Sequence, residues 1–228
     1  MDLPSTLHGQ LYLLAYDRNR RKFVFDHTNA WNPRWRFGYA MRAAMLTDLY
    51  LGGYVENRDG KAYPSGSTSQ DDPALDDLLS RVSGRTWEKL VTVGGSRAID
   101  AVRDQLETSG WIARGRRRMF GVLPAADVKL YDEDVVGGFA DRVTGALRNI
   151  LDGLSADPRP LALGLIAMQA QLPVVEEFIA DEHDREQLRE MTLAAIEPIL
   201  ALHHAVIAEL MNSRSGGGCG GGGCGGGG

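Results

Sequence analysis

The chain has 228 residues and a net charge of −5, and hydrophobic and charged residues make up 43% and 24% of it. This composition is ordinary for a soluble globular protein with one sizeable core. The negative net charge argues against a general attraction to nucleic acid or anionic membranes, so an anion-binding role requires a local basic patch.

Hydrophobic residues recur at helical spacing over most of the chain, and Gly, Pro and Asp punctuate the pattern. The predicted helices cover residues 5–16, 37–51, 74–82, 85–92, 97–109, 133–152, 157–172 and 184–211. Short strands are predicted at residues 22–25, 54–57 and 61–63, and a hairpin with a basic tip at residues 111–125. The fold class is therefore mainly α, a helical-bundle core with small β-hairpins, one of them exposed and basic.

Several helix ends have local signals. Ser5 or Thr6 can cap the first helix, and Asp71 or Asp72 can cap the helix that starts at Pro73. Pro198 is expected to start or kink a segment within the last predicted helix. The N-terminus lacks a signal-peptide pattern, and no apolar run reaches the roughly 18 residues of a membrane span, so we expect a cytoplasmic protein.

The chain ends in a tail of glycines that contains Cys219 and Cys224. Because glycine loses much entropy on ordering and has no side chain to bury, we expect residues 213–228 to be disordered and residues 1–212 to form the folded domain. The fold then needs no disulfide. The tail can be a passive linker, a metal ligand or a substrate for azole-forming modification, and intact mass distinguishes the last of these.

The sequence carries no recognisable motif for catalysis or for a cofactor. No dinucleotide-binding or Walker glycine loop, zinc-protease helix or nucleophile elbow occurs, so we predict no enzyme, no cofactor and no metal site. Gly94-Gly95-Ser96 precedes a helix and is read as a loop and cap that can also hold an anion. His203 and His204 are adjacent, so they lie on different helix faces. Residues 181–184 are interpreted as a solvated helix cap.

Several stretches resemble the Golgi phosphoprotein 3 family, in the correct order. FGYAMRAAMLTDLYLGGYVE at 37–56 is similar to the family's signature helix, with a Trp-Asn pair before it and an Arg within it. LHGQLYLLAYD, DDPALDDLL, DQLETSGWI and DPRPLALGLIAMQAQLPVVEEF resemble further family segments, so the likeness covers about residues 5–212. The family includes bacterial members, which is consistent with the arginine-rich composition of this chain, 21 Arg against 4 Lys.

The resemblance implies a non-catalytic peripheral membrane protein that binds anionic phospholipid headgroups, by analogy phosphatidylinositol 4-phosphate, at the inner face of the membrane. Arg42 matches the arginine on the family's signature helix, Trp31 or Trp35 its tryptophan, and Arg97 is the nearest basic residue to the expected downstream pair. Arg34 and Arg36 are expected to lie in a loop, where they can converge on the same ligand. A planar guanidinium suits a phosphate, and tryptophan suits a headgroup layer.

The basic hairpin is the second candidate surface. Arg114, Arg116, Arg117 and Arg118 beside Met119 and Phe120 would suit an anionic bilayer or, as the resemblance implies, self-association. An alternative function is a protein-interaction adaptor that holds membrane-enzyme tails without binding lipid. Nucleic-acid binding through the arginine patches is disfavoured by the acidic net charge.

Overall fold

The computed structural model describes residues 2–25, 34–66, 69–119, 123–179 and 181–215. Its helices are α1 (Leu7–Leu14), α2 (Arg34–Leu51), α3 (Pro73–Leu79), α4 (Trp87–Thr92), α5 (Gly95–Thr108), α6 (Glu133–Leu151), α7 (Pro158–Gln169), α8 (Pro173–Glu176), α9 (Glu182–Leu193) and α10 (Glu197–Ser215). Its strands are β1 (Tyr16–Asp17), β2 (Lys22–Phe23), β3 (Val55–Arg58), β4 (Lys61–Pro64), β5 (Arg85–Thr86), β6 (Ile112–Met119) and β7 (Leu123–Leu130). The predicted fold class, mainly α with small hairpins, is confirmed.

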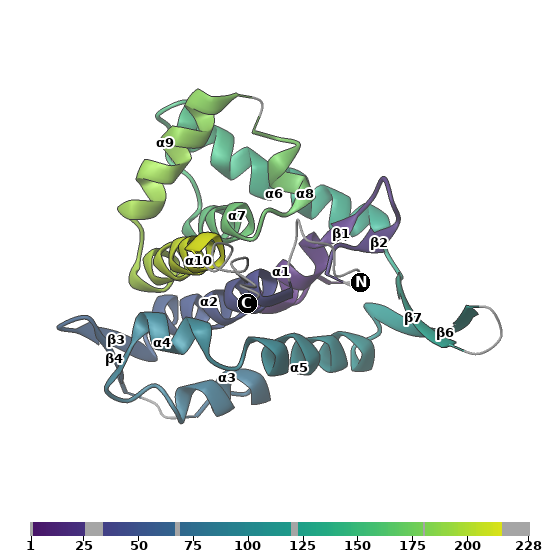
Figure 1. Cartoon of the computed structure of the whole chain (residues 1–228), viewed down its shortest axis with the longest axis horizontal. Coiled ribbons are helices and arrows are strands. Elements are labelled where there is room, and N and C mark those ends of the chain that lie inside the picture. Colours follow the sequence, from purple (N-terminus) through teal and green to yellow (C-terminus); the bar gives the residue numbers. More distant parts are fainter. Residues whose placement is uncertain (1, 26–33, 67–68, 120–122, 180, 216–228) are drawn as a thin grey trace, which may run out of the picture.

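Helix α2 runs through the middle of the molecule, with α3 and α5 on one side and α6 and α7 on the other (Figure 1). It contacts α1, α3, α4, α5, α7 and α10. A helix with neighbours on most of its sides must be apolar or small around most of its circumference. In α2 this is achieved by Phe37, Met41 and Leu46 together with the small Ala40 and Ala44, all of them fully buried.

The strands pair only within small antiparallel units at the edges of the helical body. β1 pairs with β2, β3 with β4 and β5, and β6 with β7. The β6–β7 hairpin extends from one end of the molecule, and β3 and β4 lie at the opposite end (Figure 1). The predicted basic hairpin is thus confirmed as a backbone element. Residues 85–86, predicted as helix, instead form the third strand beside β4.

Several helix boundaries differ from the sequence prediction, and two of the differences affect its interpretation. The first is the start of α2, which lies at Arg34 rather than at Phe37, so the expectation that Arg34 and Arg36 lie in a loop is wrong. The second is the predicted helix over residues 184–211, which is in fact two helices, α9 and α10. Pro198 is the second residue of α10, where its missing backbone N–H is tolerated. In the interior of one long helix the same proline would break the helix, so α9 and α10 are separate.

None of the described helices alone has the length and apolar character needed to cross a bilayer. Residues Glu182–Leu193 and Glu197–Asn212 pass that test only as a pair, and the chain bends by 119° between them.

Helices α2 and α5 approach each other at two glycines. A Cβ built on Gly95 would lie 2.8 Å from the carbonyl carbon of Gly38, closer than non-bonded atoms tolerate. The contact involves backbone on both sides, so neither partner can rotate away. Because Gly38 lies about one turn before Arg42, this crossing sets the separation between Arg42 and the first turns of α5.

Gly95→Ala is therefore expected to destabilise the fold by about 1–3 kcal/mol through overpacking. Gly145→Ala in α6 is the matched control, because a Cβ there meets nothing within 4 Å. It should instead stabilise by about 0.4–1 kcal/mol by restricting the unfolded chain. Urea unfolding of both variants measures the difference, and equal midpoints for Gly95→Ala and wild type would contradict the close-packed crossing.

Candidate anion-binding pocket

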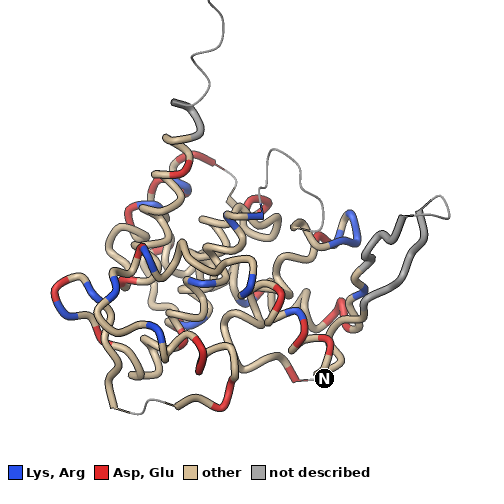
Figure 2. Tube along the Cα trace, turned by 60° about the horizontal axis from the view of Figure 1, so that its bottom comes forward, with Lys and Arg blue, Asp and Glu red and all other residues tan. Residues whose placement is uncertain are grey.

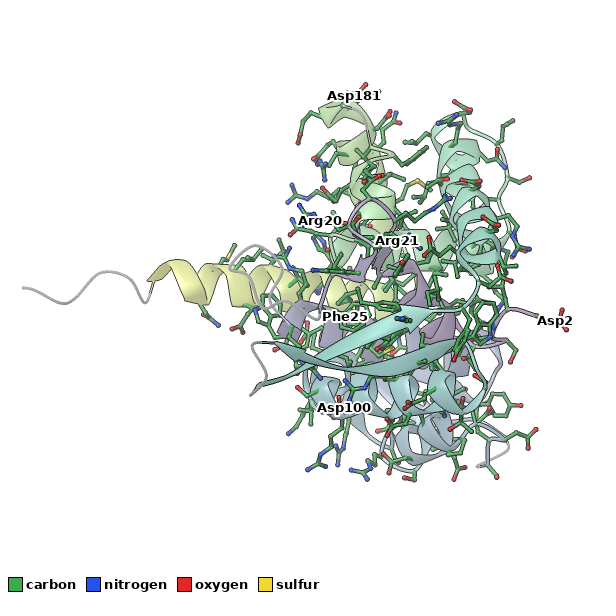
Figure 3. The ribbon with its side chains drawn as sticks, turned by 90° about the vertical axis from the view of Figure 1, so that its right-hand side faces the viewer. Asp2, Arg20, Arg21, Phe25, Asp100 and Asp181 are labelled. Atoms are coloured by element: carbon green, nitrogen blue, oxygen red, sulfur yellow. The ribbon has the colours of Figure 1, made fainter. Side chains whose placement is uncertain are left out.

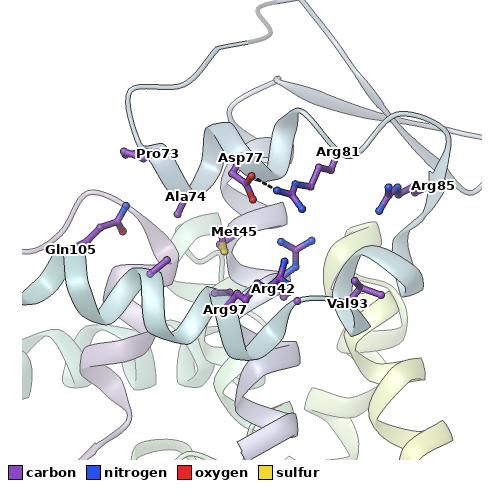
Figure 4. A pocket seen from close by; sticks show the side chains of 13 residues that line it. Arg42, Met45, Pro73, Ala74, Asp77, Arg81, Arg85, Val93, Arg97 and Gln105 are labelled. Atoms are coloured by element: carbon purple, nitrogen blue, oxygen red, sulfur yellow. Dashed lines mark hydrogen bonds and ion pairs between the residues drawn. The ribbon is translucent and has the colours of Figure 1, made fainter.

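A cavity of about 390 Å³ opens between α2, α3 and the start of α5 (Figure 4). Four arginines and one aspartate line it, and we call it the arginine pocket: Arg42, Asp77, Arg81, Arg85 and Arg97. Met45 and Ala74 contribute apolar wall. Elsewhere basic and acidic residues intermingle over the chain (Figure 2), so a gathering of four arginines around one hollow is a local feature.

Arg42 is the deepest of these cations. Its guanidinium Nε donates a hydrogen bond of 2.9 Å to the carbonyl oxygen of Leu90, which ties α2 to α4. Burial lowers the pKa of Arg42 to about 10, with the charges of Arg81 and Arg85 acting in the same direction and that of Asp77 opposing them. The side chain is therefore still charged at neutral pH, in surroundings where a bound anion would stabilise that charge.

The other arginines come from the turn after α3 (Arg81), the start of β5 (Arg85) and α5 (Arg97). Arg81 donates to Asp77 at 2.5 Å, and both side chains are about half exposed. Among the described residues, Arg42, Arg85 and Arg97 form no ion pair with a carboxylate. In Figure 4 the heads of Arg42 and Arg81 approach each other across the cavity from α2 and from beyond α3. This arrangement leaves positive charge uncompensated inside a hollow.

The amino-terminal end of α5 adds to that potential. Gly94 lines the pocket and caps α5 with a left-handed backbone at φ 85°, which favours glycine. No side chain caps the helix there. Unpaired N–H groups and the helix dipole favour an anion at such an end. Gly94 is therefore the predicted cap and lies beside the arginines, whereas Gly95 and Ser96, predicted as loop, are the first two residues of α5.

A buried ion-pair network supports the α3 wall from behind. His8 of α1 is fully buried, with Nδ1 3.6 Å from Asp48 Oδ2 and Nε2 3.3 Å from Asp72 Oδ2. Asp72 also caps α3 by accepting from the N–H groups of Ala74 and Leu75. It accepts a further bond of 3.2 Å from Gln105, a residue that lines the pocket. His8 thus fixes the residue that positions both walls.

Of the predicted headgroup residues, the structure brings Arg42 and Arg97 together and leaves three others outside. Arg34 pairs with Asp100 at 3.0 Å. Trp35 packs against Tyr39 at 5.2 Å between ring centroids, and Arg36 is buried with its guanidinium 5.5 Å from the Trp35 ring. Because the helix already includes these residues, they face α5 and the core rather than the pocket. Trp31 lies outside the described residues.

Arg81 and Arg85 were missed by the sequence reasoning. Neither belongs to a run of basic residues: Arg81 stands alone in the turn after α3, and Arg85 is the first residue of β5. No local pattern marks them, because only the packing of α3 against α2 turns them toward Arg42.

The structure describes the backbone of the predicted basic hairpin. Arg114, Arg116, Arg117 and Arg118 lie on β6, opposite residues of β7. Their side chains and that of Met119 are outside the described part of the structure, as is Phe120 altogether. Of the tail predicted to be disordered at residues 213–228, residues 213–215 instead continue α10, and residues 216–228 lie outside the described residues. Membrane contact and self-association through the hairpin remain predictions.

The remaining sequence candidates have structural roles. Asp181 accepts from the N–H of Asp184 at 2.9 Å, which confirms the cap. His203 faces Gln169 while His204 faces Glu88, which confirms that they lie on different faces. Within the described ranges, no three metal-ligating side chains come together.

The fold and the pocket define a class: a mainly α-helical protein with a cationic, helix-end pocket and protruding hairpins. A model of the Golgi phosphoprotein 3 (GPP34) family matches residues 7–210, nearly the whole described chain. The chain belongs to this family, which confirms the resemblance drawn from its motifs. No curated protein sequence gave a match.

Proposed function

We propose that this chain is a non-catalytic peripheral membrane protein that binds anionic phospholipid headgroups in the arginine pocket, at the inner face of the membrane. The observation that carries the proposal is the pocket's charge: four arginines against one aspartate, with three of the arginines unpaired by any described carboxylate. The planar guanidinium of arginine suits a phosphate monoester, because its paired N–H donors match two phosphate oxygens. Family membership favours a headgroup as the source, and phosphatidylinositol 4-phosphate as the first one to test.

Charge also distinguishes this pocket from the larger hollow of about 590 Å³ between the β1–β2 turn and α6. That hollow is lined by four acidic residues and one arginine: Asp17, Glu133, Asp141, Glu177 and Arg18. A phosphate placed there would face net negative charge. The arginine pocket is therefore the better candidate for an anion despite its smaller volume.

Arg81→Ala combined with Arg85→Ala should weaken binding to anionic vesicles by about 10- to 30-fold, since each basic residue near such a surface contributes roughly 1 kcal/mol. Wild-type binding should also fall with salt. Co-sedimentation with vesicles containing phosphatidylinositol 4-phosphate, and with neutral vesicles, measures both effects.

The matched control is Arg20→Ala with Arg21→Ala, which removes the same charge from the β1–β2 turn. These side chains are 77% and 75% exposed and do not line the pocket. Figure 3 shows them on the other side of the β6–β7 hairpin from Asp100 of α5. The control should bind like wild type. Equal recovery of the wild type with neutral and anionic vesicles would refute the proposal.

The adaptor alternative is favoured by a different observation, an apolar groove of about 320 Å³ between α7 and the α9–α10 corner. All its lining residues are apolar, including Leu51, Leu161 and Ile196. Capture of a membrane enzyme that is lost with Leu51→Glu and unaffected by Arg42→Ala would favour this function over headgroup binding.

A further inference from the structure

Asp77 is the only acidic residue among the described side chains that line the arginine pocket. A carboxylate in a site for an anion weakens binding of that anion, so its position needs a reason. Asp77 contributes little to the stability of the fold. Its side chain is 59% exposed, and the one hydrogen bond described for its carboxylate is accepted from Arg81, four residues later. Exposed pairs of this kind contribute only about 0.3–0.5 kcal/mol.

We propose that Asp77 is the specificity-determining residue of the arginine pocket, selecting ligands that carry a hydroxyl group beside their phosphate. This rests on the proposed function and adds the chemical class of the ligand, a phosphomonoester of a polyol. A lipid headgroup and a soluble sugar phosphate share this chemistry. A phosphate without adjacent hydroxyls, or with a second phosphate in their place, is disfavoured.

The exchange of partners at Arg81 explains the selection. Arg81 points toward Arg42 across the pocket (Figure 4), so a bound phosphate is able to take over the guanidinium that Asp77 holds in the empty pocket. The carboxylate of Asp77 then lies beside the ligand with acceptor positions to fill, and a hydroxyl is a neutral donor that can fill them. A ligand without a donor leaves a carboxylate facing a phosphate.

The backbone of Asp77 is held in place for this role. Its helix, α3, is capped by Asp72, which is itself fixed by His8 and Gln105. The charge of Asp77 acts on Arg42, where it opposes the lowering of the arginine's pKa by burial. The carboxylate therefore acts on the space between Arg42 and Arg81, where we expect the phosphate to bind.

Calorimetry with three soluble probes tests the selection: inositol monophosphate, methyl phosphate and inositol bisphosphate. Wild type should bind the inositol monophosphate about tenfold more tightly than methyl phosphate, the expected size of one hydrogen bond to a charged acceptor. Asp77→Ala should reduce this ratio to near one and should tighten binding of methyl phosphate and of the bisphosphate by about fivefold. Asp77→Asn keeps an acceptor without the charge, so it should keep much of the hydroxyl preference and lose the discrimination against bisphosphate.

Asp100→Ala is the matched control, since it removes the same charge from α5 at a carboxylate that pairs with Arg34 and Arg103 outside the pocket. It should leave all three ratios unchanged. An unchanged ratio in Asp77→Ala would overturn the role of Asp77 while leaving the pocket's function intact.

A parallel series distinguishes a lipid headgroup from a soluble sugar phosphate as the ligand. It uses vesicles that contain phosphatidylinositol monophosphate or phosphatidic acid at equal charge. If the probes bind only as lipids, the selectivity ratios are taken from the vesicles, and the same shift in Asp77→Ala is expected. Absence of binding by wild type to both vesicles and soluble probes would instead overturn the proposed function itself.

Discussion

Arg42→Ala should reduce binding to anionic vesicles by about 10- to 100-fold, the largest loss expected from any single substitution in the pocket. Arg42 is the most deeply buried of the four arginines, so its hydrogen bonds to an anion are the least screened by water. A charge-assisted hydrogen bond contributes about 1.5–3 kcal/mol, which corresponds to that range. Co-sedimentation over a series of lipid concentrations gives the ratio.

The variant also removes the bond from Arg42 Nε to Leu90, which leaves a buried carbonyl unpaired at a cost of about 1–3 kcal/mol. Unfolding curves are therefore needed beside the binding curves. Arg42→Lys keeps the charge without the planar donor pair, so it should bind between wild type and Arg42→Ala. Arg103→Ala is the control, because Arg103 pairs with Asp100 and does not line the pocket. A similar loss of binding in Arg103→Ala would contradict the assignment of the site.

His8→Gln should destabilise the fold by about 3 kcal/mol at pH 6 and remove an alkaline decline in stability that the wild type shows. Burial alone would lower the pKa of His8, but the carboxylates of Asp48 and Asp72 outweigh it and raise the pKa to about 8. Removing one partner of a buried ion pair leaves the others uncompensated, with typical costs of 3–5 kcal/mol.

The direction in which stability changes with pH follows from the raised pKa of His8. A pKa of His8 raised from 6.5 to about 8 means that the folded protein holds this proton more tightly than the unfolded chain. The stabilisation is fully present below pH 6.5 and is lost as the pH rises through 8, about 2 kcal/mol in all. The pKa of Asp72 is affected most by burial, which would raise it, but His8 and the helix N–H groups lower it to about 2. Its contribution is therefore lost between about pH 3.8 and pH 2.

Urea unfolding at pH 6 and pH 9 tests this prediction, since other groups that titrate in this range do so equally in wild type and variant. The difference in unfolding free energy between the two pH values should shrink by about 2 kcal/mol in His8→Gln. His183→Gln, at an exposed position of α9, should retain the wild-type difference. An identical pH dependence in all three proteins would show that His8 is not charged in the folded state.

The sequence by itself determined the helical class of this protein, because hydrophobic spacing, proline and capping aspartates act locally. Asp72 caps α3, and Pro198 lies in the first turn of a new helix, as their residue types predict. The family resemblance, carried by the segment around Arg42, was also recoverable, since it depends on residue order alone.

The tertiary structure decided which charges meet. Arg34 and Arg36 stand closer in sequence to Arg42 than Arg81 and Arg85 do, yet the latter pair lines its pocket. The first turn of α2 is tied to α5 by the ion pair between Arg34 and Asp100, which no local pattern encodes. The glycine contact between α2 and α5 and the contacts of His8 with Asp48 and Asp72 then fix the pocket walls, and these residues are forty or more positions apart in the chain. Electrostatic potential depends on distance in space, so the site became visible only when those helices were packed together.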